Sequence, residues 1–212
     1  MSATFERAPE NAALRNGSLW IRAQAADTLA DAGLIANAKL NFKPINQDGN
    51  SGSNTIGFDP TITVDCQQTA VTDVAAVLGL PQKILKQVII VADDERFYLA
   101  DFMLNPEGSL DMSGGESKFT LTGHKKMSTT QAKRIHFKRL DAADQPAVPV
   151  SDAAYTNAFT QDCLVEVSGG TVTAIDVNGT VTGQTSGTFL VLAGQTITLT
   201  YTVAPTWVWF GN

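Results

Sequence analysis

Apolar and polar residues alternate along residues 37–45 and again along residues 58–68, which is the period of a half-exposed β-strand. We expect these two segments to pair as a hairpin. Pro44 has no N–H to donate to a ladder, so the first strand should end there or lie at a sheet edge. Ser18–Ala23 is a further short strand, and the alanine-rich residues 24–36 form a short helix or a loop.

Three strands are expected in succession near the middle of the chain: Gln87–Val91, Arg96–Leu104 and Glu116–Gly123. Turn residues separate them at Ala92–Glu95 and at Asn105–Gly108. The first of these strands is apolar on both faces, as in the centre of a sheet.

Residues 72–80 carry the clearest helix signal. Thr72 can cap the helix, Asp73 suits its positive N-terminal end, and Gly79 followed by Pro81 ends it. The helix is short, so packing against the sheet must stabilise it.

The connection between the first two strands, residues 46–57, is longer than the two to five residues that close most hairpins. It is rich in Gly, Asn and Ser. Two interpretations stay open: a mobile surface loop, or a hairpin arm that folds onto a neighbouring subunit. On the second interpretation the contacts come from Gln47, Asp48, Asn50, Ser51, Asn54 and Ile56.

From Cys163 the chain becomes rich in Thr, Val and Gly. We expect short strands at Leu164–Val167, Thr171–Val177, Thr180–Gly183, Thr188–Ala193 and Thr196–Val203. Asn178-Gly179 is the strongest hairpin-turn signal in the chain. At the end of the chain, Trp207 and Trp209 share one face. They belong to a final strand that seals this part, or they form an aromatic surface for a partner or a sugar.

Charge divides the chain near Asp141. Residues 141–212 hold six of the 21 acidic residues and none of the 15 basic residues, so they carry the whole net charge of −6. We therefore expect an N-terminal arm (residues 1–17), a β-barrel or β-sandwich core with one short helix (18–140), a linker with a possible helical turn (141–161) and a small Ig-like β-sandwich (162–212). The fold class is mainly β.

Residues 118–139 contain seven bases and no acid. The bases are Lys118, Lys125, Lys126, Lys133, Arg134, Lys138 and Arg139. They form a solvated face paired with acids elsewhere, an ion-pair surface between subunits, or a weak nucleic-acid site. The acidic pI of about 4.8 disfavours the last alternative.

The sequence contains no catalytic or phosphate-binding motif, so we expect neither an enzyme nor a cofactor. An enzyme would need His124 or His136 to meet Asp101 in a pocket. Cys66 and Cys163 are expected as buried thiols rather than a disulfide, and no metal site is expected. The N-terminus has no signal-peptide pattern and no apolar run suggests a membrane helix, so we expect folding in a cytoplasm.

The order of these elements resembles the major tail tube protein of long-tailed bacteriophages. The features that carry the resemblance are the polar arm, the long hairpin of residues 37–68, the short helix and the strands ending near Leu140. The Thr- and Gly-rich C-terminal part is similar to small accessory modules on phage structural proteins.

The resemblance implies a structural virion protein that forms hexameric rings, stacked into a tube through which DNA passes without sequence-specific binding. It implies that residues 47–57 and 1–17 bridge rings and that the accessory domain projects outward. We expect the seven bases to lie at a subunit interface or on the outer wall, because phosphate contacts in the lumen would retard DNA. Expected partners are further copies of the chain and other virion proteins, with assembly in the host cytoplasm.

Two alternatives stay open. One is another virion part, such as a capsid decoration protein or a distal-tail or baseplate component. The other is a carbohydrate-binding module that uses Trp207 and Trp209.

Overall fold

The computed structural model describes residues 12–14, 17–22, 30–49, 52–68, 83–106, 117–124, 127–128 and 134–212. The described residues are mainly β, and none of them is helical. The predicted helix at residues 72–80 lies outside them. They divide into two compact units: the first holds the residues up to Asp93 and Phe97–His136, and the second holds Asp94–Arg96 and Phe137–Asn212.

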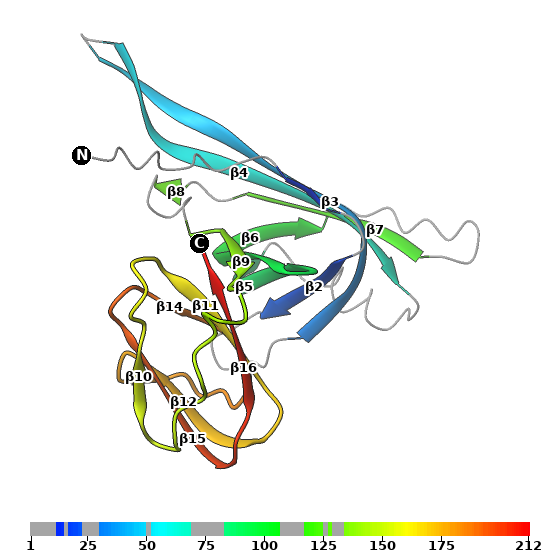
Figure 1. Ribbon diagram of the computed structural model, residues 1–212. Coiled ribbons are helices and arrows are strands. Elements are labelled where there is room, and N and C mark those ends of the chain that lie inside the picture. The colour runs from blue at the N-terminus through cyan, green and yellow to red at the C-terminus, as the bar shows by residue number, and fades with distance from the viewer. Residues whose placement is uncertain are drawn as a thin grey trace. The chain divides into compact units, whose positions relative to one another are not determined.

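The first unit is an antiparallel sheet that curls into a half-barrel (Figure 1). Its strands are β1 (Ala12–Leu14), β2 (Gly17–Arg22), β3 (Ala30–Gly49), β4 (Gly52–Gln68), β5 (Lys83–Ala92), β6 (Glu95–Pro106), β7 (Ser117–His124) and β8 (Met127–Ser128). In space the order is β6, β5, β2, β3, β4 and β7, with β1 also on β3 and β8 also on β4. Over Met103–Pro106, β6 pairs with β7 as well.

The three strands predicted in the middle of the chain are confirmed as β5, β6 and β7. Val88, Ile89 and Ile90 are at most 1% exposed, because β5 lies between two other strands and its apolar side chains are covered on both faces. The turn before β6 was predicted over Ala92–Glu95, and in the structure it consists of Asp93 and Asp94. Asp93 has a positive φ of 44°, as such two-residue turns require.

The strand β3 is much longer than the alternation predicted. The expectation of a helix or loop over residues 24–36 is wrong for residues 30–36, which are extended. There β3 pairs with β2 on one side and β4 on the other, and two ladders outweigh the helix propensity of alanine. The strand also runs through Pro44, whose only pairing among the described residues is to β4. Pro44 therefore lies at an edge, where its missing N–H costs no ladder bond.

The second unit contains two antiparallel sheets. One has the order β9, β16, β11, β14 and the other β10, β15, β12, β13. The strands are β9 (His136–Arg139), β10 (Ala154–Thr156), β11 (Cys163–Ser168), β12 (Thr171–Val177), β13 (Thr180–Val181), β14 (Gly187–Val191), β15 (Thr196–Val203) and β16 (Thr206–Gly211). Each strand that was predicted from Cys163 onward therefore exists: β12 and β15 have the predicted bounds, and the ends of β11, β13 and β14 differ by one or two residues.

The two sheets of the second unit share one hydrophobic core. Alternate residues of β11, β12, β14, β15 and β16 point into it, and Val165, Ile197 and Leu199 are fully buried. Around Trp209 the rings of Tyr155, Phe159 and Trp207 pack at centroid distances of 5.3, 6.2 and 5.4 Å. Burial of this apolar area is the main stabilising contribution to the unit.

Residues 141–153, expected to be part of a linker, are tied to this core. The Trp207 Nε1–H donates to the Pro146 carbonyl at 2.7 Å, and the Tyr201 hydroxyl donates to the Pro149 carbonyl at 2.6 Å. The possible helical turn that was expected after the prolines is instead strand β10, which pairs with β15. Tyr155 is half-buried against the core.

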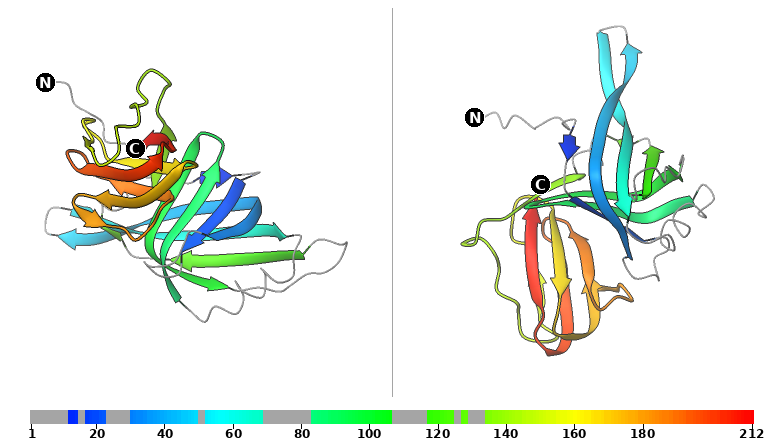
Figure 2. Two further views of the ribbon diagram at one scale, coloured as in Figure 1. Left: turned by 90° about the horizontal axis from the view of Figure 1, so that it is seen from below. Right: turned by 90° about the vertical axis from the view of Figure 1, so that its right-hand side faces the viewer.

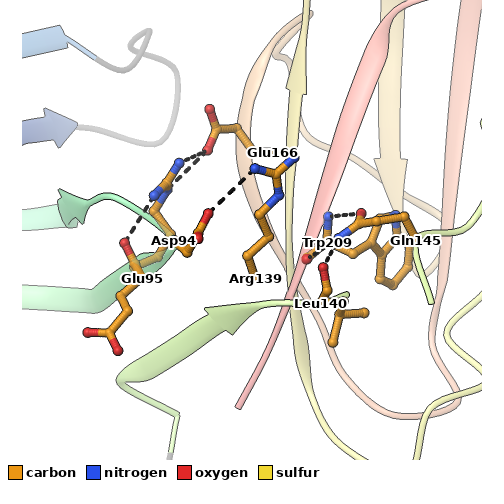
Figure 3. Close-up of polar contacts among 8 residues, drawn as sticks. Asp94, Glu95, Arg139, Leu140, Gln145, Glu166 and Trp209 are labelled. Carbon is orange, nitrogen blue, oxygen red and sulfur yellow. Dashed lines mark hydrogen bonds and ion pairs between the residues drawn. The ribbon is translucent and has the colours of Figure 1, made fainter. Parts of the chain in front are cut away.

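The side-chain amide of Gln145 pairs with the backbone of β16 as another strand would. Its Nε2 donates to the Trp209 and Leu140 carbonyls at 3.0 and 2.9 Å, and its Oε1 accepts the Trp209 N–H at 2.8 Å (Figure 3). On this side of β16, the strand β9 reaches only Phe210 and Gly211. Gln145 therefore covers the next polar groups along the edge.

The turn between β12 and β13 confirms the predicted Asn-Gly hairpin. Val177 faces Thr180 in register, so Asn178 and Gly179 alone connect the strands. Their φ angles are 51° and 74°, the paired positive values of a type I′ turn.

Candidate assembly site

The outer part of the β3–β4 hairpin extends beyond the other strands of the first unit (Figures 1 and 2). Among the described residues, β3 pairs with β2 and β1 only up to Leu40. The strand β4 pairs with β8 at Gly57 and Phe58 and with β7 from Thr61 onward. Within the part of the chain that the structure describes, the segments Asn46–Gly49 and Gly52–Thr55 are therefore paired only to each other. We call these two segments the hairpin tip.

The hairpin tip corrects the view of residues 46–57 as a loop. Both strands continue into it with regular pairing, from Asn46 opposite Thr55 to Gly49 opposite Gly52. The Thr55 hydroxyl donates to the Asn46 side-chain oxygen at 3.0 Å, which adds a polar cross-strand contact. The glycines and asparagines that suggested a loop are accommodated because a two-stranded ribbon leaves both faces open to solvent.

A β-bulge marks the inner end of the hairpin tip. Ile45 faces Gly57 and the next pair is Asn46 with Thr55, so Ile56 has no residue opposite it. The Ile56 side chain is 52% exposed, which is unusual for a large aliphatic residue. Bulges bend a strand and redirect a side chain. Here the bulge presents an apolar group at the base of the polar tip.

Below the bulge, aromatic packing holds the hairpin to its base. The rings of Phe42 and Phe58 meet edge to face with centroids 6.4 Å apart. They lie diagonally across the two strands, since Phe42 is opposite Pro60 and Phe58 is opposite Pro44. Leu40, one alternation further in, is 2% exposed. Support from apolar packing thus decreases along the hairpin towards its tip.

A two-stranded ribbon of this kind is marginally stable in water, and its outer edges carry unpaired backbone N–H and C=O groups. Of the predicted contact residues, Gln47, Asp48, Asn54 and Ile56 lie on the hairpin tip or its bulge, and Gln47 is exposed. Asn50 and Ser51 lie outside the described residues. The outer edges of the hairpin tip can pair with a strand of another subunit without any rearrangement of the rest of the sheet.

The structure does not gather the described members of the basic set on one element. Lys118 is on β7 opposite Gln67, Arg134 is half-buried before β9, and Lys138 and Arg139 are exposed on β9. The other three bases, Lys125, Lys126 and Lys133, lie outside the described residues. Arg139 forms an exposed ion pair with Asp94 at 3.5 Å, as a solvated charged face would.

Trp207 and Trp209 are only 6% and 0% exposed. Both rings belong to the core of the second unit, and β16 seals that core as the first of the two interpretations supposed. The aromatic surface that the sequence suggested for a partner or a sugar is therefore corrected: alternation along β16 places both tryptophans on its inward face. A ring in such a position stacks on neighbouring side chains and not on a ligand.

An ion pair that the sequence gave no sign of lies in the second unit. Arg96 is only 9% exposed, and its Nε and Nη2 donate to Glu166 Oε2 at 3.1 and 3.0 Å (Figure 3). Its Nη1 donates to the Glu95 carbonyl, and its guanidinium lies 4.4 Å from the Phe210 ring centroid. Arg96 and Glu166 are 70 residues apart, so no local pattern could have revealed the contact.

The groups considered for chemistry do not form a described site. His136 stacks on Phe97 with ring centroids 4.6 Å apart, while His124 is on β7 opposite Met103 of β6. Within the described residues no cluster of His, Cys, Asp and Glu could hold a metal ion, and no helix is long and apolar enough to cross a membrane.

Cys163 is a buried free thiol. Burial raises its pKa from 9.0 to about 11, while a hydrogen bond to the Asn157 side chain opposes the rise and Asp162 adds to it. The Asn157 amide also donates to the carbonyls of Val191 and Gln161 at 2.9 and 3.1 Å. Cys163 is thus held as an unreactive core residue.

Comparison of the chain with protein-family models, with curated proteins and with solved structures found no match.

Proposed function

We propose that this protein is a structural subunit that assembles into stacked hexameric rings, as the tail tube proteins of long-tailed phages do. In this proposal the half-barrel of the first unit closes with its neighbours into a continuous barrel around a lumen through which DNA passes. The second unit is an Ig-like β-sandwich on the outside.

The observation that carries the proposal is the hairpin tip. A ribbon that pairs only with itself, with Ile56 exposed at its base, is costly for an isolated protein to maintain. Docking on a neighbouring subunit would bury Ile56 and pair the open edges, at about 25 cal/mol for each Å² of apolar surface removed from water. Such an arm can link one ring to the next.

The charge distribution supports the same proposal. The seven bases of residues 118–139 would lie between subunits or on the outer wall, away from the lumen; one of them, Arg139, has an acidic neighbour, Asp94, within its own chain. The acid-rich second unit would face outward. A lumen poor in bases lets DNA move because few phosphates are gripped.

The test is negative-stain electron microscopy of the concentrated protein and of a variant in which residues 46–56 are replaced by Asn-Gly, so that a two-residue turn joins Ile45 to its partner Gly57. The shortened hairpin keeps the packing of Phe42 on Phe58, so the subunit should fold as the original does. We expect hollow tubes or sixfold rings from the original protein and only single subunits from the variant. Circular dichroism and thermal melting of the variant check its fold.

Tubes formed equally well by the shortened variant would exclude the hairpin tip as the link between rings. Discrete trimers or monomers from the original protein, even with preformed tubes as seeds, would contradict the tube and favour a capsid decoration or baseplate protein. The carbohydrate-binding alternative has lost its main support, because Trp207 and Trp209 are buried.

A further inference from the structure

The Asn178-Gly179 turn places two groups that can react with each other side by side: the Asn178 carboxamide and the Gly179 backbone nitrogen. Both residues are exposed at the end of the β12–β13 hairpin. The Asn178 N–H donates to the Thr196 carbonyl at 2.7 Å. Among the described residues, neither the Asn178 carboxamide nor the Gly179 N–H has a hydrogen-bond partner. An electrophilic carbon and a solvated amide nitrogen are therefore adjacent and unengaged.

We propose that Asn178 is a site of spontaneous deamidation, with its own carboxamide as the substrate and water as the second reactant. The Gly179 amide nitrogen loses its proton and attacks Asn178 Cγ. A new N–Cγ bond forms, the Cγ–Nδ2 bond breaks, and the side-chain nitrogen leaves as ammonia. Water then opens the resulting five-membered imide at one of its two carbonyls, which leaves aspartate or isoaspartate; no group is oxidised or reduced.

Glycine after the asparagine makes the ring closure possible. Gly179 has no Cβ to obstruct the attack, and no atom lies within 4 Å of the place where a Cβ would stand. The imide therefore has open space on its outer side. The neighbouring strand β13 has only two residues, both exposed, so the turn can distort without disturbing the core.

The product changes the second unit in two ways. Deamidation adds one negative charge to residues 141–212, which already hold six acids and no base. Isoaspartate also adds one carbon to the main chain within a two-residue turn, which displaces the pairing of Val177 with Thr180. This inference does not depend on the proposed function.

Asn157 is a matched comparison within the same unit. It is 1% exposed, both ends of its amide are hydrogen-bonded, and Ala158 follows it. The folded protein should be incubated at several pH values and then digested with a protease. Mass spectrometry of the peptides detects the increase of about 1 Da that accompanies replacement of the amide by a carboxyl group. We expect the modified fraction of the Asn178 peptide to rise with time and with pH, and the Asn157 peptide to stay unmodified.

The Asn178→Gly variant sharpens the test. A Gly-Gly pair also forms the type I′ turn, so the hairpin is kept while the reactive carboxamide is removed. We expect this variant to melt as the original protein does and to lose the mass increase from that peptide. The proposal is overturned if the folded protein modifies Asn178 no faster than Asn157, or if modification occurs only after the peptide has been released by proteolysis.

Discussion

The hairpin tip and the second unit hold their strands together by different means. Within the described residues the tip is paired only through its own two strands; Asn46, Gln47 and Thr55 are exposed, and Ile56 beside it is 52% exposed. The second unit has shorter strands, yet side chains such as Val165 and Leu199 are fully buried between its sheets. The two longest strands, β3 and β4, thus end in a segment joined by backbone pairing, whereas the shorter strands of the second unit pack on a shared core.

In the proposed assembly, this difference makes the hairpin tip the part that would dock on a neighbouring copy. Backbone hydrogen bonds contribute little net stability in water, because each replaces bonds to solvent. Burial of apolar area supplies most of the stabilisation, and the hairpin tip has little of it. The second unit is stabilised by its own buried core, whereas contact with another surface would add to the stability of the tip.

The largest expected effect is in the core of the second unit. Replacement of Trp209, which is 0% exposed, by Ala removes the ring that packs on Tyr155 and Trp207. We expect a loss of about 3–5 kcal/mol in the free energy of unfolding, measured by urea denaturation. The exposed Val181 is the control, since Val181→Ala should change stability by less than about 0.5 kcal/mol. Equal effects of the two changes would contradict the core as described.

A smaller effect is expected at the half-buried ion pair. Glu166→Gln keeps an acceptor for Arg96 but removes the charge, so the guanidinium over Phe210 loses its counter-ion. We expect a loss of about 1–2 kcal/mol, with little dependence on salt. The exposed pair of Asp94 with Arg139 is the control: Asp94→Asn should cost less than about 1 kcal/mol, and salt should screen most of it. A pair at Glu166 that salt abolishes would be a solvated contact and not a buried one.

The smallest expected effect is at the bulge beside the hairpin tip. Ile56→Thr removes an exposed apolar group, so the stability of the isolated subunit should change by less than about 0.5 kcal/mol in thermal melts. The same substitution at Ile89, which is 1% exposed, should cost about 2–3 kcal/mol because it buries a hydroxyl and leaves a void. A large loss at Ile56 would mean that the tip is packed in the isolated chain.

Side-chain pattern predicted the strands where burial is one-sided or complete. Residues 58–68 alternate in sequence and form β4, and Val88–Val91 of β5 are apolar throughout, with Val88, Ile89 and Ile90 at most 1% exposed. Asn178-Gly179 predicted its turn because few residue pairs adopt two successive positive φ angles. In each case the residues favour locally the same backbone conformation that they adopt in the structure.

The pattern failed where pairing alone determines the structure. The sequence of the tip is polar and shows no apolar alternation, so its glycines and asparagines resemble those of a loop. The residues at the start of β3 are extended because the preceding strand β2 and the last residues of β4 pair with them. Arg96 and Glu166 are 70 residues apart and come together only when the chain folds, so the residues next to each of them in the sequence could not predict the contact.

The side-chain amide of Gln145 has a consequence for how copies of this chain can meet. By occupying the Trp209 N–H and carbonyl, it removes a docking point for a foreign strand on that edge of β16. A protein that polymerises must keep most of its edges closed so that growth proceeds from one of them. In the assembly proposed above, Gln145 would block this edge of β16, while the edges of the hairpin tip would stay available for pairing with another copy.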